Sequence, residues 1–451
     1  MIRFSSELEA ESWLSYIRDE IRPAYTKPLM PGLSSRRLLV VVNPIGGKGK
    51  GEEIFHELLK PMLTAAGTAH EVIVTTGPLH AHKITQTMKL DEVGAIAVVG
   101  GDGLFGEVLN GLNSRPDRLE ALDLRIGIVP AGSSNCLACS VGLRQPLAAA
   151  FSIARGCSKP LDVLKVTLEN ENVILSVCGV SYGFISEVNT HAGKWRWLFG
   201  PARYSVCGLR TILASPLKYH VDCRFQPPTF DHEEFDKTEC GPDCVACARH
   251  VRSERALESP SQPKSPDKSY IRRRSSSAVV ETVGATAPPE ASTSATAADA
   301  PVEEANGEAK NWIDSGVFVD PRRRSLRPQM EQIDASTLLL FSITNLSIRQ
   351  SQNKTVWNPH CHMASGYMDL VLMPVISRFQ LIKFFSQFTK TRHMDGSVFS
   401  VIKAKSVEMK LTADQLPEWE KEIQIAIDGE VYPLQPLRVD TIHGLLNLML
   451  S

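Results

Sequence analysis

The first part of the chain alternates between short apolar runs and stretches in which apolar residues recur every three or four positions. This pattern predicts strands at Leu38–Val42, Glu71–Thr75, Ala95–Val99 and Ile126–Val129, and helices at Gly51–Ala66, His80–Met88, Leu104–Leu112 and Ser133–Val141. A series of alternating strands and helices forms a parallel sheet that binds ligands at the carboxyl ends of its strands. We therefore expect an α/β domain over residues 35–158, preceded by an amphipathic helix and a linker in residues 1–34.

From residue 159 to 451 the pattern changes to longer β-rich runs. These predict strands at Val163–Leu168, Val173–Val180, Leu217–Phe225, Thr337–Thr344, Tyr367–Pro374, Val398–Met409 and Glu422–Ile427, with a helix at Gln380–Phe388. A mostly antiparallel β domain fits this order best. Residues 253–309 interrupt it and are rich in Pro, Ser, Thr, Ala and Glu, so we expect a disordered insert there.

Three glycine-bearing turns follow strands of the predicted parallel sheet. They are Asn43–Gly49, Gly100–Gly103 and Pro130–Asn135. Glycines allow phosphate oxygens to approach the backbone, and the amides at helix N-termini stabilise negative charge. Asp102 lies within one of these turns, where a carboxylate can orient a metal or accept a proton from an alcohol. The three turns together predict a nucleotide phosphate site.

The spacing of the glycines excludes two common phosphate-binding motifs. A P-loop requires Gly-x-x-x-x-Gly-Lys-Ser/Thr, and Gly46–Lys50 has neither the spacing nor the hydroxyl. A dinucleotide fingerprint requires Gly-x-Gly-x-x-Gly, and the residues after Gly49 do not continue it.

Composition narrows the class of protein further. The chain has 451 residues, 43% of them hydrophobic, and can bury two cores. Its net charge of −1 argues against nucleic-acid binding through a general electrostatic footprint. Early charged residues interrupt any leader sequence, and no run approaches the roughly 18 apolar residues of a membrane span. We therefore expect a cytoplasmic protein with peripheral membrane contact, whose ten cysteines are reduced thiols.

The glycine turns lie within longer stretches that resemble the diacylglycerol-kinase catalytic superfamily, specifically its sphingosine and ceramide kinases. The matching stretches are Val42–Gly49, Gly101–Leu112, Ile128–Ser133 and Ala426–Glu430. Apart from the insert, the resemblance extends from about Leu38 to Val431. It implies a kinase that transfers phosphate from ATP to a lipid hydroxyl in a cleft between two domains.

Combined with the turns, the resemblance predicts a role for each site residue. Asp102 is expected to be the general base, and the alternative is a cap for the helix that contains Leu104. Asp428 and Glu430 are expected to return from the C-terminal segment and complete the site around Mg²⁺. The predicted ATP-binding residues are Asn43, Pro44, Gly46, Gly47, Lys48, Thr75, Gly101, Gly103, Glu107, Gly132, Ser133, Ser134, Arg196, Arg203, Asp428, Gly429 and Glu430.

The two arginines of this set lie in a basic segment with interleaved aromatic residues, Lys194–Tyr204. Its likeness to the family implies that Arg196 and Arg203 reach the ATP phosphates, where bidentate guanidinium contacts are strong. Surface ion pairing is the alternative. The aromatic residues also suit a membrane interface, from which a lipid kinase must extract its substrate.

The lipid substrate is predicted from residues Glu187 and Asn189. Sphingosine kinases carry an aspartate two positions after an acidic residue in the matching segment, and it reads the free amine of sphingosine; here Asn189 follows Glu187. Ceramide is N-acylated and offers no cation, so this difference favours ceramide, with sphingosine as the alternative. By contrast, Asn110–Leu112 and Ser133–Ala138 are closer to the sphingosine kinase form.

The N-terminal segment departs from the pattern of ceramide kinases, which normally begin with a pleckstrin-homology domain. Here only the helix Ser6–Ile21 precedes the kinase-like part. This helix could be a remnant of such a domain, and the chain a truncated or alternative form.

A cysteine cluster also resembles ceramide kinases. Cys240, Cys244 and Cys247 have the Cys-x-x-x-Cys-x-x-Cys spacing, and His250 follows at a distance compatible with a zinc ligand. Reduced thiols that tune loop packing or a redox response are the alternative, and His360–His362 offers further, more distant ligands.

Two further interpretations concern regulation and the absence of catalysis. Arginine runs precede Ser275, Ser276, Ser277 and Ser325, a pattern typical of sites for a regulatory kinase but also of simple solvated charge. A catalytically inactive lipid-binding scaffold is the non-enzyme alternative, against which the intact Gly101–Gly103 and Asp428–Glu430 motifs argue.

Overall fold

The computed structural model describes residues 36–195, 203–228, 239–241, 243–247, 330–351, 356–388, 400–410, 416–421 and 423–450. Several predicted features lie outside these residues: the helix Ser6–Ile21, the insert 253–309, Arg196, His250, and the serines Ser275, Ser276, Ser277 and Ser325.

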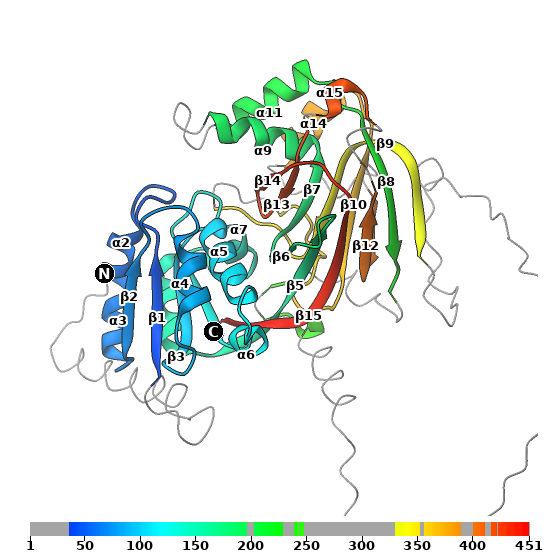
Figure 1. Cartoon of the computed structure of the whole chain (residues 1–451). Helices are drawn as coiled ribbons and strands as arrows, with labels where there is room; N and C mark the ends of the chain where they lie inside the picture. The colour runs from blue at the N-terminus through cyan, green and yellow to red at the C-terminus, as the bar shows by residue number, and fades with distance from the viewer. Residues whose placement is uncertain are drawn as a thin grey trace, which may run out of the picture.

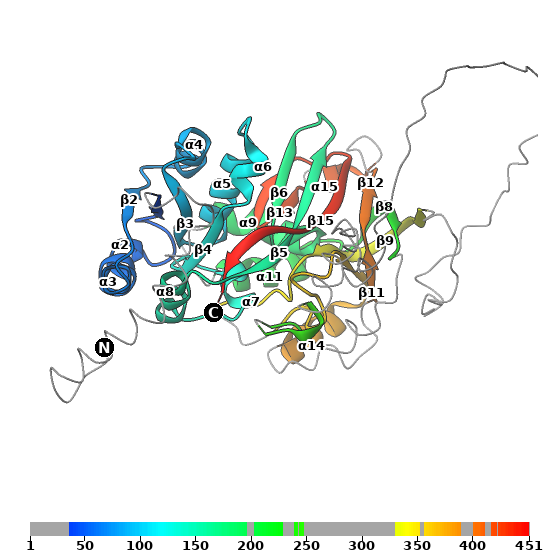
Figure 2. The same cartoon turned by 90° about the horizontal axis from the view of Figure 1, so that it is seen from below.

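The N-terminal part is a parallel sheet covered by helices on both faces (Figures 1 and 2). Its strands are β1 (Arg37–Val42), β2 (His70–Val74), β3 (Val93–Gly100) and β4 (Arg125–Pro130), in the order β2-β1-β3-β4. Its helices are α2 (Gly51–Ile54), the π-helical η1 (Phe55–Leu59), α3 (Lys60–Ala65), α4 (His80–Thr87), α5 (Asp102–Asn113), α6 (Arg118–Leu122), α7 (Cys136–Ser140) and α8 (Pro146–Arg155). The central strands are almost wholly buried, which explains their continuous apolar runs.

The C-terminal part is a mostly antiparallel sheet with helices α9, α11, α14 and α15 at one end (Figure 1). Its strands are β5 (Ser158–Leu168), β6 (Val173–Ser176), β7 (Gly179–Gly183), β8 (Tyr219–Gln226), β9 (Glu331–Thr344), β10 (Met368–Pro374), β11 (Ser400–Ala404), β12 (Ser406–Met409), β13 (Ile425–Ile427), β14 (Glu430–Tyr432) and β15 (Leu437–Met449). The helices are α9 (Phe184–Lys194), α11 (Arg203–Ala214), α14 (Arg378–Phe388) and α15 (Glu418–Lys421). The predicted fold class, α/β followed by antiparallel β, is confirmed.

Strand β15 joins the two parts, and the sequence analysis did not predict it. Its residues from Leu437 onward pair antiparallel with β12 and β5, and near the end Asn447 and Leu448 pair in parallel with β4. Figure 2 shows β15 running from the antiparallel sheet to the edge of the parallel one. The C-terminal strand thereby fixes the parallel sheet against the antiparallel one. The exact domain boundary at residue 158 stays a prediction.

Two runs that were each predicted as a single strand are divided into two strands in the structure. Val173–Val180 is divided into β6 and β7, because the backbone amides between them turn toward the side chain of Asp428. Val398–Met409 is divided at Lys405, because β11 pairs with β10 whereas β12 pairs with β8 and β15.

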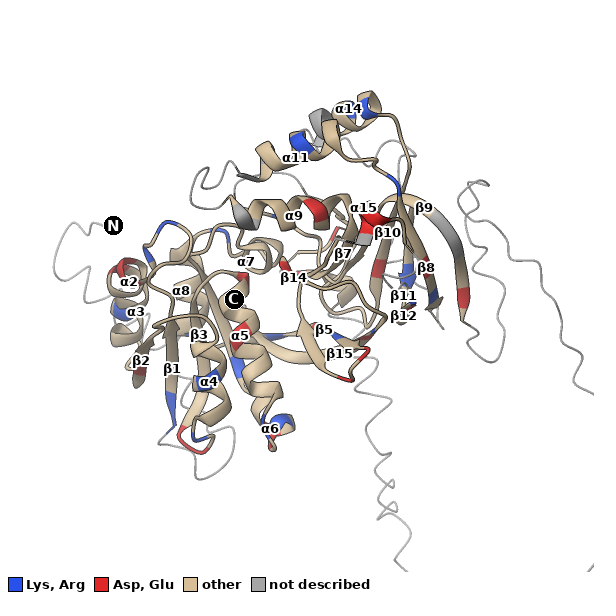
Figure 3. Ribbon diagram, turned by 45° about the horizontal axis from the view of Figure 1, so that its top comes forward, with Lys and Arg blue, Asp and Glu red and all other residues tan. Residues whose placement is uncertain are grey.

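Two further features concern the distribution of charged residues and the length of the apolar helices. Acidic and basic residues are interspersed over both parts of the described chain (Figure 3), in keeping with the net charge of −1. Among the described residues, none of the helices is both long and apolar enough to cross a membrane.

Candidate functional site

The three glycine turns contact one another at the carboxyl ends of β1, β3 and β4. A Cβ added to Gly132 would lie 2.5 Å from the Cα of Gly101, and one added to Gly47 would lie 2.5 Å from the carbonyl oxygen of Ala131. Gly47 also has a φ of +59°, a conformation that favours glycine. These positions therefore require glycine, because any side chain would separate turns that touch through their backbones.

Two asparagine side chains hold the outer turns in shape. Oδ1 of Asn43 accepts hydrogen bonds from the backbone N–H groups of Ile45 (3.0 Å) and Gly46 (2.9 Å). Asn135 accepts from the N–H of Gly132 (2.8 Å) and donates to its carbonyl oxygen (3.0 Å). Asn43 was predicted as a ligand contact and here shapes its own turn, whereas the role of Asn135 was missed.

The carboxylate of Asp102 caps a neighbouring helix. The N–H groups of Cys136 and Leu137, the first two residues of α7, donate to its two oxygens at 2.9 Å each. Its own helix, α5, shows no side-chain cap. Asp102 is therefore a helix cap, but it caps α7 and not α5, the helix that contains Leu104. Burial raises the pKa of Asp102, the amides of Leu137 and Cys136 oppose this, and the charge of Asp428 raises the pKa further.

Asp428 lies in a pocket of donors between β6 and β7. It accepts hydrogen bonds from Ser176 Oγ (2.6 Å) and from the backbone N–H groups of Val177 (2.9 Å), Cys178 (2.9 Å) and Gly179 (3.0 Å). Its φ is +49°, so the turn to Gly429 is tight. Three of these donors contact Oδ1 and one contacts Oδ2, so the carboxylate is held firmly at the break between β6 and β7.

Glu430 brings the C-terminal motif to the glycine turns. It is exposed, and a Cβ on Gly103 would lie 3.4 Å from its Oε1. The structure thus places Glu430 of the segment Asp428–Glu430 beside Gly103. Of the two acidic residues in this segment, Glu430 is the one whose carboxylate faces the turn from an exposed position.

The remaining predicted nucleotide contacts surround these turns. Oε2 of Glu107, on α5, accepts from the N–H of Ala81 at the start of α4 (3.2 Å). Thr75 is buried directly after β2, and its N–H donates to the carbonyl oxygen of Val42 (2.8 Å). Lys48 is exposed, and Pro44 is partly buried.

The segment after β9 contacts the third turn, which the sequence did not indicate. Ser351 donates from its hydroxyl to the carbonyl oxygen of Ser133 (3.0 Å) and from its N–H to that of Ser134 (2.9 Å). These contacts fix the backbone of a predicted phosphate-binding turn from the C-terminal part. Of the two predicted arginines, Arg203 begins α11, and Arg196 lies in an undescribed segment.

Helix α9 carries the two predicted lipid-binding residues, which differ in environment. Glu187 is buried and accepts hydrogen bonds from the hydroxyls of Ser215 and Tyr219, the latter at 2.7 Å. Asn189 is only half-buried. Residues two positions apart on a helix do not face the same direction, and Asn189 is the more exposed of the two.

A second buried carboxylate, missed by the sequence analysis, completes the network beneath α9. Glu420 is fully buried and accepts from Tyr182 Oη (2.7 Å) and from the N–H of His220 (2.6 Å). The rings of Tyr182 and Tyr219 meet edge to face, with centroids 6.2 Å apart. Burial and Glu420 raise the pKa of Tyr182, so it remains a neutral donor.

The cysteine cluster is assembled, and its histidine comes from the more distant stretch His360–His362 that the sequence also offered. Cys240, Cys244 and Cys247 surround Nδ1 of His362, which the turn before β10 supplies. His250 lies outside the described residues, and His362 supplies the only histidine nitrogen of the cluster among those described.

Several known lipid kinases are similar to this chain in sequence. A ceramide kinase from Homo sapiens is 26% identical over 411 residues, which are 88% of this chain and 64% of that protein. Sphingoid long-chain bases kinase 1 from Arabidopsis thaliana is 38% identical over 43% of this chain and 26% of its own length. Sphingosine kinase 2 from Homo sapiens is 39% identical over 39% of this chain and 29% of its own length. The matched regions therefore cover between 26% and 64% of the lengths of these relatives.

Solved structures and family models give the same result. The crystal structure of a diacylglycerol kinase from Bacillus anthracis has a TM-score of 0.53 at 17% identity, with 92% of this chain and 97% of that one covered, which shows a shared fold. Residues 37–166 match the model of the diacylglycerol kinase catalytic domain, which includes the three glycine turns and Asp102. The resemblance predicted from these turns is therefore confirmed for residues 37–166, which match a diacylglycerol kinase catalytic domain.

Proposed function

We propose that the protein is an ATP-dependent lipid kinase that phosphorylates the primary hydroxyl of ceramide. The observation that carries this proposal is the meeting of three glycine turns beside Asp102, with Glu430 opposite Gly103. Closely packed backbone turns at strand ends suit phosphates. A partly buried carboxylate beside them suits an alcohol acceptor.

In this proposal the turns bind the nucleotide. Gly46, Gly47 and Gly132 offer backbone amides, Ser133 and Ser134 add hydroxyls, and Lys48 adds charge at the exposed edge. Thr75 and Glu107 border the same region from β2 and α5. Arg196 and Arg203 are proposed to bind the ATP phosphates.

Asp102 is proposed to receive the proton of the lipid hydroxyl as the phosphoryl group is transferred. The transition state of such a transfer is loose, so catalysis consists mainly of positioning and charge neutralisation. The amides of Cys136 and Leu137 hold the carboxylate in one orientation and leave each oxygen a second lone pair.

Magnesium would be held by Glu430 together with phosphate oxygens. Mg²⁺ takes one or two protein carboxylates and keeps its other positions for phosphate and water, and when bound it neutralises phosphate charge. The exposed carboxylate of Glu430 beside Gly103 fits this requirement. Asp428 fits a supporting position, because three donors contact its Oδ1 and it shapes the turn that presents Glu430.

Ceramide is proposed as the substrate because of Asn189. An amide can hydrogen-bond to an acylated nitrogen or a hydroxyl, but it cannot pair with an ammonium group. The ceramide kinase relatives also match over most of the chain, whereas the sphingosine kinases match over less than half. Sphingosine remains the alternative substrate, because the sphingosine and sphingoid base kinases have a higher sequence identity to this chain within their shorter matched regions than the ceramide kinases have.

Exposed apolar side chains on two helices support peripheral membrane contact. Leu209 and Leu213 are 55% and 64% exposed on α11, and Phe379 is 78% exposed on α14. Both helices lie at the same end of the antiparallel sheet as α9 (Figure 1). Asn189, on α9, therefore belongs to the same end of the molecule as these exposed side chains.

One assay tests the proposed function. Labelled ATP is supplied with ceramide, sphingosine or diacylglycerol in parallel micelles, and the phosphorylated lipid is quantified. We expect transfer to ceramide above the other two. Transfer to sphingosine would favour the alternative, and folded protein without transfer to any lipid would favour an inactive scaffold.

Gly132→Ala is expected to weaken ATP binding at least tenfold and to destabilise the fold by about 1–3 kcal/mol, the usual range for overpacking. The new Cβ would meet backbone atoms of Gly101, which cannot move aside as a flexible side chain can. Nucleotide titration and thermal unfolding measure the two effects.

The matched control is Gly106→Ala on α5, where an added Cβ meets no atom within 4 Å. It should bind ATP normally and be slightly more stable, because alanine favours the helix. Equal ATP affinity in both variants would show that the contact of the turns is not needed for the nucleotide.

Asn189→Asp is expected to shift the preference from ceramide toward sphingosine by about tenfold, because a charge-assisted hydrogen bond contributes about 1.5–3 kcal/mol against 0.5–1.5 for a neutral one. The change should be seen in kcat/KM for the lipid and leave ATP kinetics intact. Asn170→Asp, in the turn between β5 and β6, is the control for added charge. An unchanged ratio in folded Asn189→Asp protein would mean that this residue does not contact the head group.

A further inference from the structure

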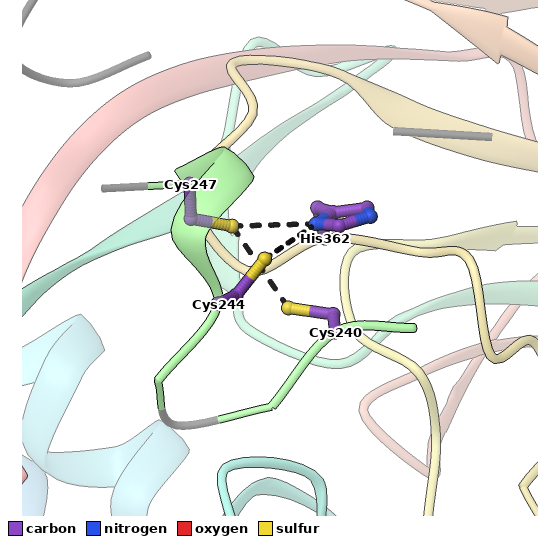
Figure 4. Close-up of side chains that lie close together, drawn as sticks. All are labelled: Cys240, Cys244, Cys247 and His362. Atoms are coloured by element: carbon purple, nitrogen blue, oxygen red, sulfur yellow. Dashed lines mark hydrogen bonds between the residues drawn. The ribbon is translucent and has the colours of Figure 1, made fainter. Parts of the chain in front are cut away.

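Three sulfur atoms and one imidazole nitrogen converge from two distant segments of the chain. Nδ1 of His362 lies 3.3 Å from Sγ of Cys244 and 3.4 Å from Sγ of Cys247, and Sγ of Cys240 lies 3.9 Å from Sγ of Cys247 (Figure 4). All four atoms lie within 4.8 Å of one another. Such a set of soft ligand atoms is not needed by the proposed kinase chemistry.

The spacing fits a tetrahedral zinc ion. With Zn–S of about 2.3 Å and Zn–N of about 2.0–2.1 Å, the edges of the tetrahedron are about 3.8 Å between sulfurs and about 3.6 Å between sulfur and nitrogen. The observed separations are close to these values. A disulfide does not fit, because Cys240 and Cys247 are far beyond the bonded S–S distance of about 2.05 Å.

The ligands are held by the surrounding backbone. The N–H of Cys240 donates to the carbonyl oxygen of Pro359 (3.2 Å), and the N–H of Met363 donates to Sγ of Cys240 (3.4 Å). Cys240, Cys247 and His362 are buried, and Cys244 is partly buried. An N–H directed at a ligating sulfur is the kind of second-shell contact that orients metal ligands.

We infer that Cys240, Cys244, Cys247 and His362 bind one structural zinc ion. Four protein ligands leave no position for a substrate, as in closed structural sites. The ion would link the segment Cys240–Cys247, after which the described chain resumes only at Met330, to the turn that precedes β10. It would therefore link two described segments of the C-terminal part that are far apart in the sequence. This inference does not depend on the proposed kinase activity.

The site has a second structural consequence. The stretch between β9 and β10 contains both His362 and Ser351, whose hydroxyl and N–H bind the turn at Ser133 and Ser134. Loss of the ion would release one end of this stretch, so its effect would extend toward the glycine turns.

The test is metal content measured on the full chain purified without chelators. We expect about one zinc per chain by mass spectrometry. Replacing zinc with Co²⁺ should give the visible bands of a tetrahedral thiolate complex, a signature that adventitious carboxylate or surface histidine binding does not produce. Cys244→Ser and His362→Ala should lose at least tenfold in zinc affinity, whereas Cys157→Ser, an exposed thiol outside the cluster, should keep the ion.

His362→Cys keeps the test decisive if the other variants do not fold. A fourth thiolate still binds zinc, so this variant should retain the ion and strengthen the sulfur-to-cobalt charge-transfer bands. The inference is overturned if the wild-type chain contains less than about 0.2 equivalents and takes up no cobalt in tetrahedral form, as a true site at partial occupancy would exceed both limits. It is equally overturned if Cys244→Ser, His362→Ala and Cys157→Ser bind zinc alike.

Discussion

Asp102→Asn is expected to lower kcat for lipid phosphorylation by about 10²-fold or more, the usual contribution of a general base, while ATP affinity changes little. The substitution also places an amide NH₂ against one of the two N–H donors of α7, so a loss of about 1 kcal/mol in stability should accompany it. A protein with ordinary stability remains folded after such a loss. Steady-state kinetics together with thermal unfolding separate the two effects.

The pH profile provides an independent measure of the same role. Burial raises the pKa of Asp102 above its ordinary value of 3.8. A base works only when ionised, so kcat should fall as the pH drops through this raised pKa, at higher pH than for an ordinary aspartate. The acidic limb should disappear in Asp102→Asn.

The matched control is Asp117→Asn, an aspartate in the same domain that is paired with Arg115. It should change neither kcat nor the acidic limb. If folded Asp102→Asn protein turned over at nearly the normal rate, the carboxylate would serve α7 alone, and the proposed mechanism would lose its base.

The parallel sheet and its glycine turns were predictable because their causes are local. A continuous apolar run makes a buried strand, and a glycine turn follows it wherever backbone segments must meet. The contacts between Gly47, Gly101 and Gly132 follow from strand order, since the carboxyl ends of parallel strands lie on one edge.

The features that the sequence analysis missed or ranked second depend on contacts between residues far apart in the chain. The spacing favoured the nearby His250 and left His360–His362 as more distant ligands, whereas in the structure His362 contacts Cys244 and Cys247 across more than a hundred residues. Likewise, nothing in the run Val173–Val180 shows that it must open between β6 and β7, because the side chain that opens it is that of Asp428. Pattern reasoning identifies a strand but not the distant group that interrupts it.

Asp428→Asn is expected to lower the free energy of unfolding by about 3 kcal/mol, because hydrogen bonds to a charged group contribute about 1.5–3 kcal/mol each and a misplaced NH₂ would face a donor. The carboxylate accepts from four groups at the break between β6 and β7, and an amide offers a single acceptor oxygen. Chemical denaturation measures this loss directly.

Glu430→Gln is the matched control, since it removes a carboxylate two residues away from an exposed position. An exposed residue of this kind should change stability by less than about 0.5 kcal/mol. Because Glu430 is the proposed magnesium ligand, this variant should instead require more Mg²⁺ for half-maximal activity. If Asp428→Asn kept its stability and Glu430→Gln kept its Mg²⁺ requirement, the two roles would have to be exchanged: Asp428 would act at the metal, and the amides at the β6–β7 break would be satisfied without its charge.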